Sequence, residues 1–85
     1  MSDIEKAFAE ATANAKKLTE KPDNDTLLKL YALFKQASEG DVSGEKPGFF
    51  DFVATAKYEA WEALAGTDQD TAMRKYVDLV KRLSG

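Results

Sequence analysis

Apolar residues recur along this sequence with the period of an α-helix, about 3.6 residues, and this period dominates the whole chain. Two proline-containing breaks and one glycine break interrupt it. The breaks leave predicted helices at about residues 4–18, 24–38, 51–65 and 68–83. Four helices of this length in an 85-residue chain predict one all-α domain, residues 1–85, folded as a four-helix bundle.

The ends of the first two predicted helices carry residues that favour capping. Ser2 and Glu5 have the spacing of a capping box, in which each side chain accepts a hydrogen bond from the other residue's backbone N–H. Lys16 falls in the predicted last turn of the first helix, where the helix dipole favours a cation. Asn24 or a neighbouring aspartate is predicted to cap the second helix, and Gly40 to end it.

The second half of the chain contains the one long predicted loop and the last two helices. The loop, residues 40–48, holds three glycines and one proline. Such a loop is either functional or a bridge between helices that lie far apart. The third helix is predicted to start near Phe50 or Asp51, with Val53 in its apolar arc. Thr67 is predicted to cap the fourth helix.

The composition excludes several kinds of active or metal site. The chain has no cysteine and no histidine, which rules out disulfides, thiolate nucleophiles, Ser-His-Asp triads and the usual zinc ligands. An enzyme built from the remaining residues would need carboxylates, lysines or tyrosines. We therefore expect no metal, no cofactor and no catalytic activity.

Charge and hydropathy limit the partners. The formal net charge of −3 argues against nucleic acid as a partner and against strong attraction to an anionic membrane. No apolar run approaches the ~18 residues of a membrane span, so we expect no stable membrane insertion. The N-terminal segment lacks the basic and apolar regions of a signal peptide, and together with the absence of cysteine this favours a cytoplasmic location.

Lysines and tyrosines lie at the borders of the predicted apolar arcs. On the second helix, Leu28, Tyr31 and Lys35 form a strip along one edge. On the first helix, Thr12 and Lys16 share the equivalent edge. Each strip is also compatible with an ordinary core edge whose lysine extends into solvent.

The last two predicted helices add one lysine and one tyrosine. Lys57 falls inside an apolar arc beside Trp61, where a buried and unpaired ammonium is too costly to persist. Its side chain must lie over Trp61, extend out of the bundle or meet an anion. Tyr76 lies on the apolar stripe of the fourth helix. Three lysines and two tyrosines in such places suit a ligand that is partly apolar and strongly anionic, although amphipathic helices routinely carry lysines at their edges.

Three segments carry a more specific pattern. They read LYALFKQASEGD at residues 30–41, KPG at 46–48 and AKYEAW at 56–61, and Ala72-Met73 precede Tyr76. In this order and spacing the chain resembles the acyl-CoA-binding proteins in their short, single-domain form, and the likeness covers nearly all of it. The resemblance implies an up-down-down-up four-helix bundle. It also implies a non-enzymatic carrier of medium- to long-chain acyl-CoA thioesters.

The resemblance also implies roles for individual residues. The positions that meet the adenine and 3′-phosphate end of CoA correspond to Tyr31, Lys35, Lys57 and Tyr76, with Lys16 as a further head-group lysine. The positions that line the acyl chain and pantetheine correspond to Thr12, Leu28 and their neighbours.

The chain departs from the family pattern at four positions. Phe34 stands at a ligand-facing position where tyrosine is usual, which removes one hydroxyl contact, and Tyr58 replaces a tryptophan. Val53 and Thr55 stand where many members carry lysines. The loss of two nearby cations is expected to weaken the electrostatic attraction of an anionic ligand. Binding should therefore also depend less on salt concentration.

Two other functions remain open from the sequence. A bundle with an exposed apolar groove can instead bind a partner helix. A thioester hydrolase is disfavoured, because no residue pairs a nucleophile with a suitable base. For a carrier, we expect a monomer that makes transient contact with acyl-CoA-using enzymes.

Overall fold

The computed structural model of the protein describes residues 2–84, so that Met1 and Gly85, the two ends of the predicted domain, lie outside the described residues. Within that range the chain forms helices and no strand. The helices are α1 (Asp3–Ala15), α2 (Asn24–Glu39), α3 (Phe52–Glu62) and α4 (Gln69–Leu83). The all-α prediction is confirmed.

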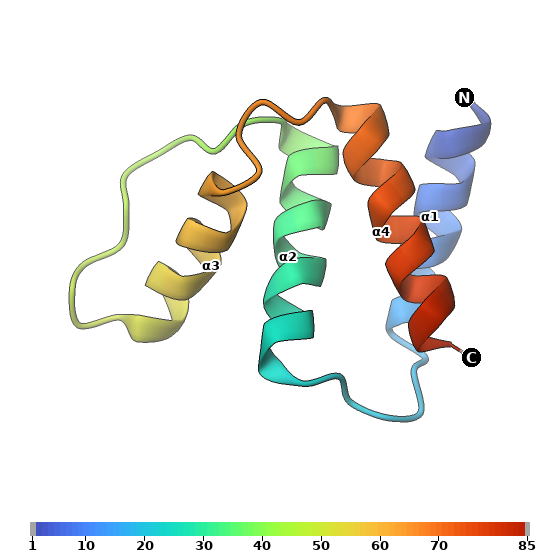
Figure 1. Cartoon of the computed structure of the whole chain (residues 1–85), viewed down its shortest axis with the longest axis horizontal. Helices are drawn as coiled ribbons and strands as arrows, with labels where there is room; N and C mark the ends of the chain where they lie inside the picture. The colour runs from blue at the N-terminus through green and yellow to red at the C-terminus, as the bar shows by residue number, and fades with distance from the viewer. Residues whose placement is uncertain (1, 85) are drawn as a thin grey trace.

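The direction of the helices also follows the prediction. In Figure 1, α1 and α4 run in one direction and α2 and α3 in the other, which is the up-down-down-up order. Parallel neighbours need a connection that returns along their full length. The long loop provides it, because it leaves the end of α2 and descends to the start of α3. The loop therefore bridges two distant helix ends, one of the two roles predicted for it.

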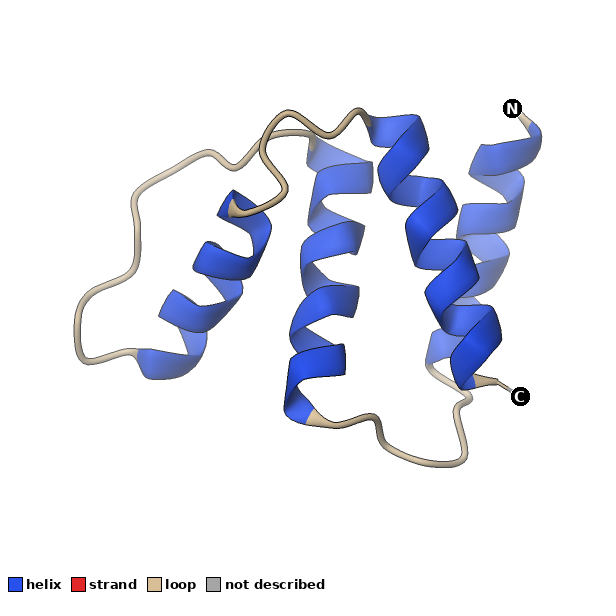
Figure 2. Ribbon diagram, in the orientation of Figure 1, coloured by secondary structure: helices blue, strands red, loops and turns tan. Residues whose placement is uncertain are grey.

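The helices form a flat arrangement. The Cα atoms extend over 37 × 29 × 15 Å, and Figure 2 shows α3, α2 and α4 side by side with α1 behind α4. α4 packs on both α1 and α2. Within the described residues, α3 packs on α2 alone among the helices. The main core accordingly lies between α1, α2 and α4, and it consists of Ala11, Leu30, Leu33, Tyr76, Val77 and Val80.

The start of α1 has the predicted cap, and its end lies earlier than predicted. The backbone N–H of Glu5 donates to the Ser2 hydroxyl at 3.2 Å and the backbone N–H of Ser2 donates to the Glu5 carboxylate at 3.4 Å, so the capping box is confirmed. The helix ends at Ala15, and Lys16 is its C-cap residue instead of a member of the last turn. The prediction erred here because the apolar period continues to Leu18 beyond the helical backbone.

The ends of α2 match the expected residue types. Asp23, the aspartate beside Asn24, accepts a hydrogen bond from the backbone N–H of Thr26 at 2.8 Å and so caps the helix. Gly40 ends the helix with φ +83°, a conformation that a residue without a Cβ adopts at little cost.

The predicted cap of α4 was wrong. Asp68, not Thr67, accepts the backbone N–H of Thr71, at 3.0 Å. The carbonyl of Thr67 is instead occupied by the side-chain amide of Gln36, which donates to it at 2.7 Å. The carbonyl of Asp68 accepts the first bond of the helix, from the backbone N–H of Ala72 at 3.0 Å, so both its backbone and its side chain make Asp68 the N-cap.

Two expectations about α3 were also wrong. The helix ends at Glu62 instead of residue 65, because the N–H groups of Leu64 and Ala65 bond to carbonyls only three residues back. Val53, placed in the apolar arc by its spacing, is 67% exposed. It lies in the first turn of α3, where it lines an open groove beside α2 instead of packing in the core.

A polar cluster around the buried Gln36 joins the ends of three helices. The side chain of Gln36 is completely buried in α2, and its amide also donates to the Asp41 carboxylate at 2.8 Å. Asp41 in turn accepts the backbone N–H of Gly66 at 2.9 Å. The indole of Trp61 donates to the carbonyl of Gly40 at 2.9 Å. These bonds fix the end of α2 to the segment between α3 and α4.

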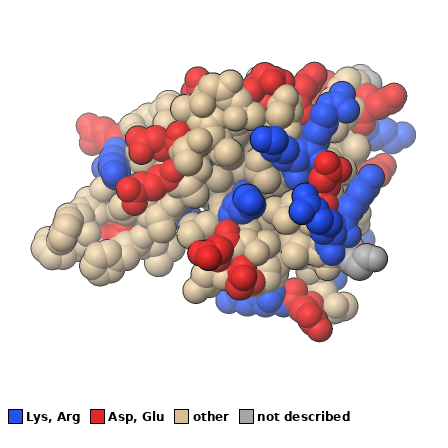
Figure 3. Space-filling view, viewed as in Figure 1, with Lys and Arg blue, Asp and Glu red and all other residues tan. Residues whose placement is uncertain are grey.

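Charge is distributed unevenly over the molecule. Figure 3 shows basic and acidic side chains interspersed over α2 and α4, whereas the end of the molecule that leads into α3, at the lower left, is mostly uncharged.

Candidate functional site

The residues predicted to form the site come from all four helices. Leu28, Tyr31 and Lys35 share one side of α2, because helical residues three and four apart lie on the same face. Phe34 lies next to this strip. The other four are Thr12 in α1, Lys16 at its C-cap, Lys57 in α3 and Tyr76 in α4.

The packing of α3 on α2 brings Lys57 to Tyr31. The ammonium nitrogen lies 5.4 Å from the centroid of the phenol ring, within the range of a cation–π contact. Lys57 is exposed and has no ion pair within the described part of the chain. Its charge therefore remains free to bind an anion. Of the three arrangements considered for this lysine, extension out of the bundle is the one observed.

A different lysine lies over the tryptophan. The ammonium of Lys35 is 5.0 Å from the centroid of the buried Trp61 ring, and it also forms an ion pair with Glu39, one turn further along α2. The hydrogen bond to Glu39 raises the pKa of the Lys35 ammonium, although partial burial opposes this. An ammonium has three donors, so one bond to Glu39 leaves two for a ligand.

Three aromatic rings connect α1, α2 and α4 beside the lysines. Phe8 contacts Phe34 with ring centroids 5.8 Å apart and meets Tyr76 edge-to-face at 5.2 Å. Tyr76 is only 5% exposed, and burial raises the pKa of its phenol. Phe34 is 40% exposed, so one side of its ring faces solvent. The cluster thus presents an apolar face, without the hydroxyl that a tyrosine at position 34 would add.

Thr12 and Lys16 continue along α1 from this cluster. They lie one and two turns after Phe8, so helical geometry places them on the same side of α1. The hydroxyl of Thr12 donates to the carbonyl of Ala9 at 2.7 Å. Lys16 is exposed and forms no ion pair among residues 2–84. No hydrogen bond in that range joins either residue to the lysines of α2 and α3.

An apolar groove lies between the starts of α2 and α3. Its volume is about 370 Å³, and its lining is Asn24, Leu27, Leu28, Phe52, Val53, Ala56 and Lys57. Two of these residues, Leu28 and Lys57, belong to the predicted site. The predicted site did not name the other five, which are Asn24, Leu27, Phe52, Val53 and Ala56. Phe52 could have been found from its spacing. It lies four residues before Ala56, which places both side chains on one face of the third helix.

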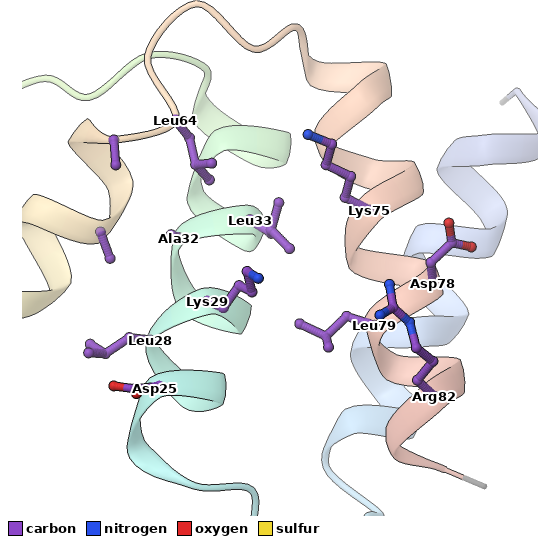
Figure 4. A pocket seen from close by; sticks show the side chains of 12 residues that line it. Asp25, Leu28, Lys29, Ala32, Leu33, Leu64, Lys75, Asp78, Leu79 and Arg82 are labelled. Atoms are coloured by element: carbon purple, nitrogen blue, oxygen red, sulfur yellow. The ribbon is translucent and has the colours of Figure 1, made fainter.

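A larger cavity, about 550 Å³, lies between α2, α3 and α4. Figure 4 shows Leu33 of α2 and Leu79 of α4 extending into it, with Lys75 and Arg82 at its edge. Leu28 is the only predicted site residue that lines it. None of the predicted lysines and tyrosines lines this larger cavity, whereas Lys57 lines the smaller groove and contacts Tyr31.

Comparison with known sequences settles the family. The Acyl CoA binding protein family matches residues 5–80 of this chain. The chain therefore belongs to the acyl-CoA-binding protein family. A relative in this family, acyl-CoA-binding protein homolog 1 of Caenorhabditis elegans, is 48% identical over 77 residues, which cover 91% of this chain and 90% of the relative.

Two further relatives show the range of the acyl-CoA-binding protein family. The crystal structure of Oryza sativa acyl-CoA-binding protein 2 has a TM-score of 0.90 and 36% identity, over 94% of this chain and 89% of the other. Enoyl-CoA delta isomerase 2 of Rattus norvegicus is 49% identical over 77 residues, but the match spans only 20% of that protein. The domain is thus found both as most of a chain and as a part of a longer enzyme.

Neither a membrane-spanning helix nor a metal-binding cluster is found in residues 2–84. No helix in that range is long and apolar enough to cross a membrane. Residues 2–84 also contain no group of three or more acidic side chains placed to hold a metal ion.

Proposed function

We propose that this protein binds medium- to long-chain acyl-CoA thioesters and carries them without catalysing a reaction. Membership of the acyl-CoA-binding protein family supports the ligand class. The observation that carries the proposal is the position of Lys57, whose exposed ammonium lies over Tyr31 at one end of an apolar groove. One small region therefore offers both an anion-binding group and a surface for a hydrocarbon chain.

The acyl chain would lie in the groove between α2 and α3. Leu27, Leu28 and Ala56 offer an apolar lining there. Each methylene transferred from water contributes about 0.8 kcal/mol when fully buried. Because the groove is open on one side, the contribution per methylene is smaller than this limit. Affinity should therefore rise with chain length until the groove is filled.

The CoA head would bind over the adjoining lysines and aromatic rings. Lys57 and Lys35 would clamp the 3′-phosphate, and Lys16 would add a further cation beyond the end of α1. Tyr31 and the exposed face of Phe34 offer surfaces on which the adenine can stack. The contribution of Tyr76 would be chiefly to hold Phe34, since its own ring is buried.

A non-enzymatic role agrees with a sequence that has neither histidine nor cysteine. We propose that residues 1–85 act as one acyl-CoA-binding domain, as a monomer in the cytoplasm, and that transient contacts deliver the ligand to acyl-CoA-using enzymes. No cofactor is needed for this role.

Isothermal titration of the delipidated protein tests the proposal directly. We expect one-to-one binding of palmitoyl-CoA, and far weaker binding of CoA and of palmitate, because each control fills only half of the site. If none of the three ligands produces heat or a thermal shift, the proposal fails. The protein would then be better explained as an interaction bundle whose groove binds a partner helix.

A further inference from the structure

The segment that enters α3 exposes three phenylalanines in succession. Phe49 is 82% exposed, Phe50 88% and Phe52 73%, and the neighbouring Val53 is also exposed. Isolated apolar residues on a surface need no explanation, but a contiguous group of large ones usually marks a contact site. We call these four residues the phenylalanine tip.

The backbone presents the first two rings to solvent. The N–H of Asp51 donates to the carbonyl of Gly48 at 3.0 Å, which closes a turn with Phe49 and Phe50 at its two central positions. Those positions normally hold glycine, proline, asparagine, aspartate or serine. The two rings pack edge-to-face on each other, with centroids 5.4 Å apart, instead of on the core.

Hydrogen bonds hold this turn in place. The Asp51 carboxylate caps α3 by accepting the N–H of Ala54 at 3.1 Å, and the hydroxyl of Thr55 donates to Gly48 at 3.3 Å. Further back in the loop, Lys46 pairs with Glu59 at 3.4 Å. The exposed rings are therefore carried on a segment that is fastened to α3.

The shape and charge around the tip indicate what it contacts. It lies at an end of the molecule that is mostly uncharged (Figure 3). Lys46 in the loop is paired with Glu59, and Asp51, exposed between Phe50 and Phe52, adds a negative charge, so the tip does not attract a polyanion. Interfacial helices bury phenylalanine at the boundary between lipid headgroups and acyl chains, and rings that project from a turn can bury their apolar surface at the same depth.

The tip is also continuous with the groove proposed for the acyl chain. Phe52 and Val53 belong to both, since they line the groove and are exposed beside Phe49 and Phe50. A lipid surface that touched the tip would therefore lie at the mouth of the groove. A hydrocarbon chain could pass from one to the other without crossing water.

We propose that the phenylalanine tip docks the protein reversibly on zwitterionic lipid bilayers, with Phe49 and Phe50 inserted at the interface, and that acyl-CoA is exchanged with the bilayer there. The exchange rests on the proposed function; the docking does not. Binding is weak, because two rings bury little area. It depends little on salt, because it does not rely on charge.

Vesicle partitioning of matched variants tests the docking. Phe49→Ser with Phe50→Ser removes the apolar rings, whereas Phe49→Leu with Phe50→Leu keeps apolar side chains at the same positions. With phosphatidylcholine vesicles, we expect the serine variant to lose about tenfold in partitioning and the leucine variant to lose much less. The serine variant should also slow the uptake of palmitoyl-CoA from vesicles. Equal partitioning of the parent and the serine variant would overturn the proposal.

Two further measurements separate the alternatives. Titration with a medium-chain acyl-CoA in the absence of lipid should give the same affinity for parent and serine variant, since neither substituted residue lines the groove. Loss of that affinity would point to a role in ligand binding and against a docking role. Self-association of the parent without lipid, abolished by the serine change, would assign the tip to a second copy of the chain and overturn the proposal.

A spectroscopic probe gives direct evidence of insertion. Phe50→Trp places an indole at the tip, and the parent protein supplies the background of its single, buried Trp61. Vesicles of brominated phosphatidylcholine should quench the added fluorescence if the ring enters the bilayer. Unquenched emission at lipid concentrations where the protein is bound would contradict insertion.

Discussion

At the scale of single residues, Lys57 and Lys35 have the same charge but different surroundings. Lys57 is free of acidic partners in the described structure, whereas Lys35 already donates to Glu39. We therefore expect Lys57→Ala to weaken palmitoyl-CoA binding by about 1.5 kcal/mol, the lower end for a charge-assisted bond because the site is exposed to solvent. This corresponds to a roughly tenfold rise in Kd by titration. Lys35→Ala should cost less.

The other side of α2 supplies a control for this prediction. Lys29 is an exposed lysine of the same helix, but it lines the larger cavity and not the groove beside Lys57. Lys29→Ala changes the net charge by the same amount, so it measures the general electrostatic effect alone. Similar losses for Lys29→Ala and Lys57→Ala would mean that Lys57 has no specific contact with the ligand.

At the scale of helices and loops, the carboxylate of Asp41 connects the end of α2 to the segment between α3 and α4. The hydrogen bonds from the Gly66 N–H and the Gln36 amide hold the pKa of Asp41 below its usual value. A lowered folded-state pKa stabilises the fold fully above the unfolded value, and this stabilisation is lost as the pH falls through the folded value. Asp41→Asn should therefore lower the unfolding free energy near neutral pH and reduce its loss on acidification.

Urea unfolding at about pH 7 and about pH 3 measures this difference. Asn keeps the acceptor oxygen that Gly66 and Gln36 require, so the change removes mainly the charge. Asp78→Asn is the matched control, because the side chain of Asp78 is exposed and its carboxylate accepts no hydrogen bond in residues 2–84. If the unfolding free energy falls by the same amount on acidification in the parent and in both variants, Asp41 does not contribute to the pH dependence of stability.

The ends of the helices show which features could be predicted from neighbouring residues in the sequence. The capping box of α1 and the glycine end of α2 were predicted correctly, because each depends on residues within one turn. The cap of α4 was not, because Thr67 and Asp68 are adjacent, both are residue types that cap helices, and the apolar period does not fix the first helical residue. In the site, helical spacing placed Tyr31 and Lys35 on one edge. It could not show which lysine covers Trp61, because that depends on how α3 packs on α2.

At the scale of the whole molecule, the flat arrangement leaves α3 packed on only one other helix within the described residues. The other helices share a core between α1, α2 and α4, whereas α3 is held by α2 and by the loops at its two ends. Because local stability follows the extent of packing, we expect the amides of α3 to exchange with solvent faster than those of α2 and α4 in the free protein. The proposed ligand would contact α2 and α3 together and so restrain the least supported helix.

Amide hydrogen exchange with and without ligand tests this coupling. At a free palmitoyl-CoA concentration of one hundred times Kd, binding stabilises the folded protein by about 2.7 kcal/mol. This stabilisation slows the exchange of every amide that exchanges only by complete unfolding. Amides of α3 that exchange by local opening should gain additional protection, because the ligand must leave before α3 detaches from α2. CoA alone lacks the chain that fills the groove between these helices and should protect α3 less. Protection confined to α1 and α4 would show that the ligand does not bridge α2 and α3, and would place the acyl chain elsewhere in the protein.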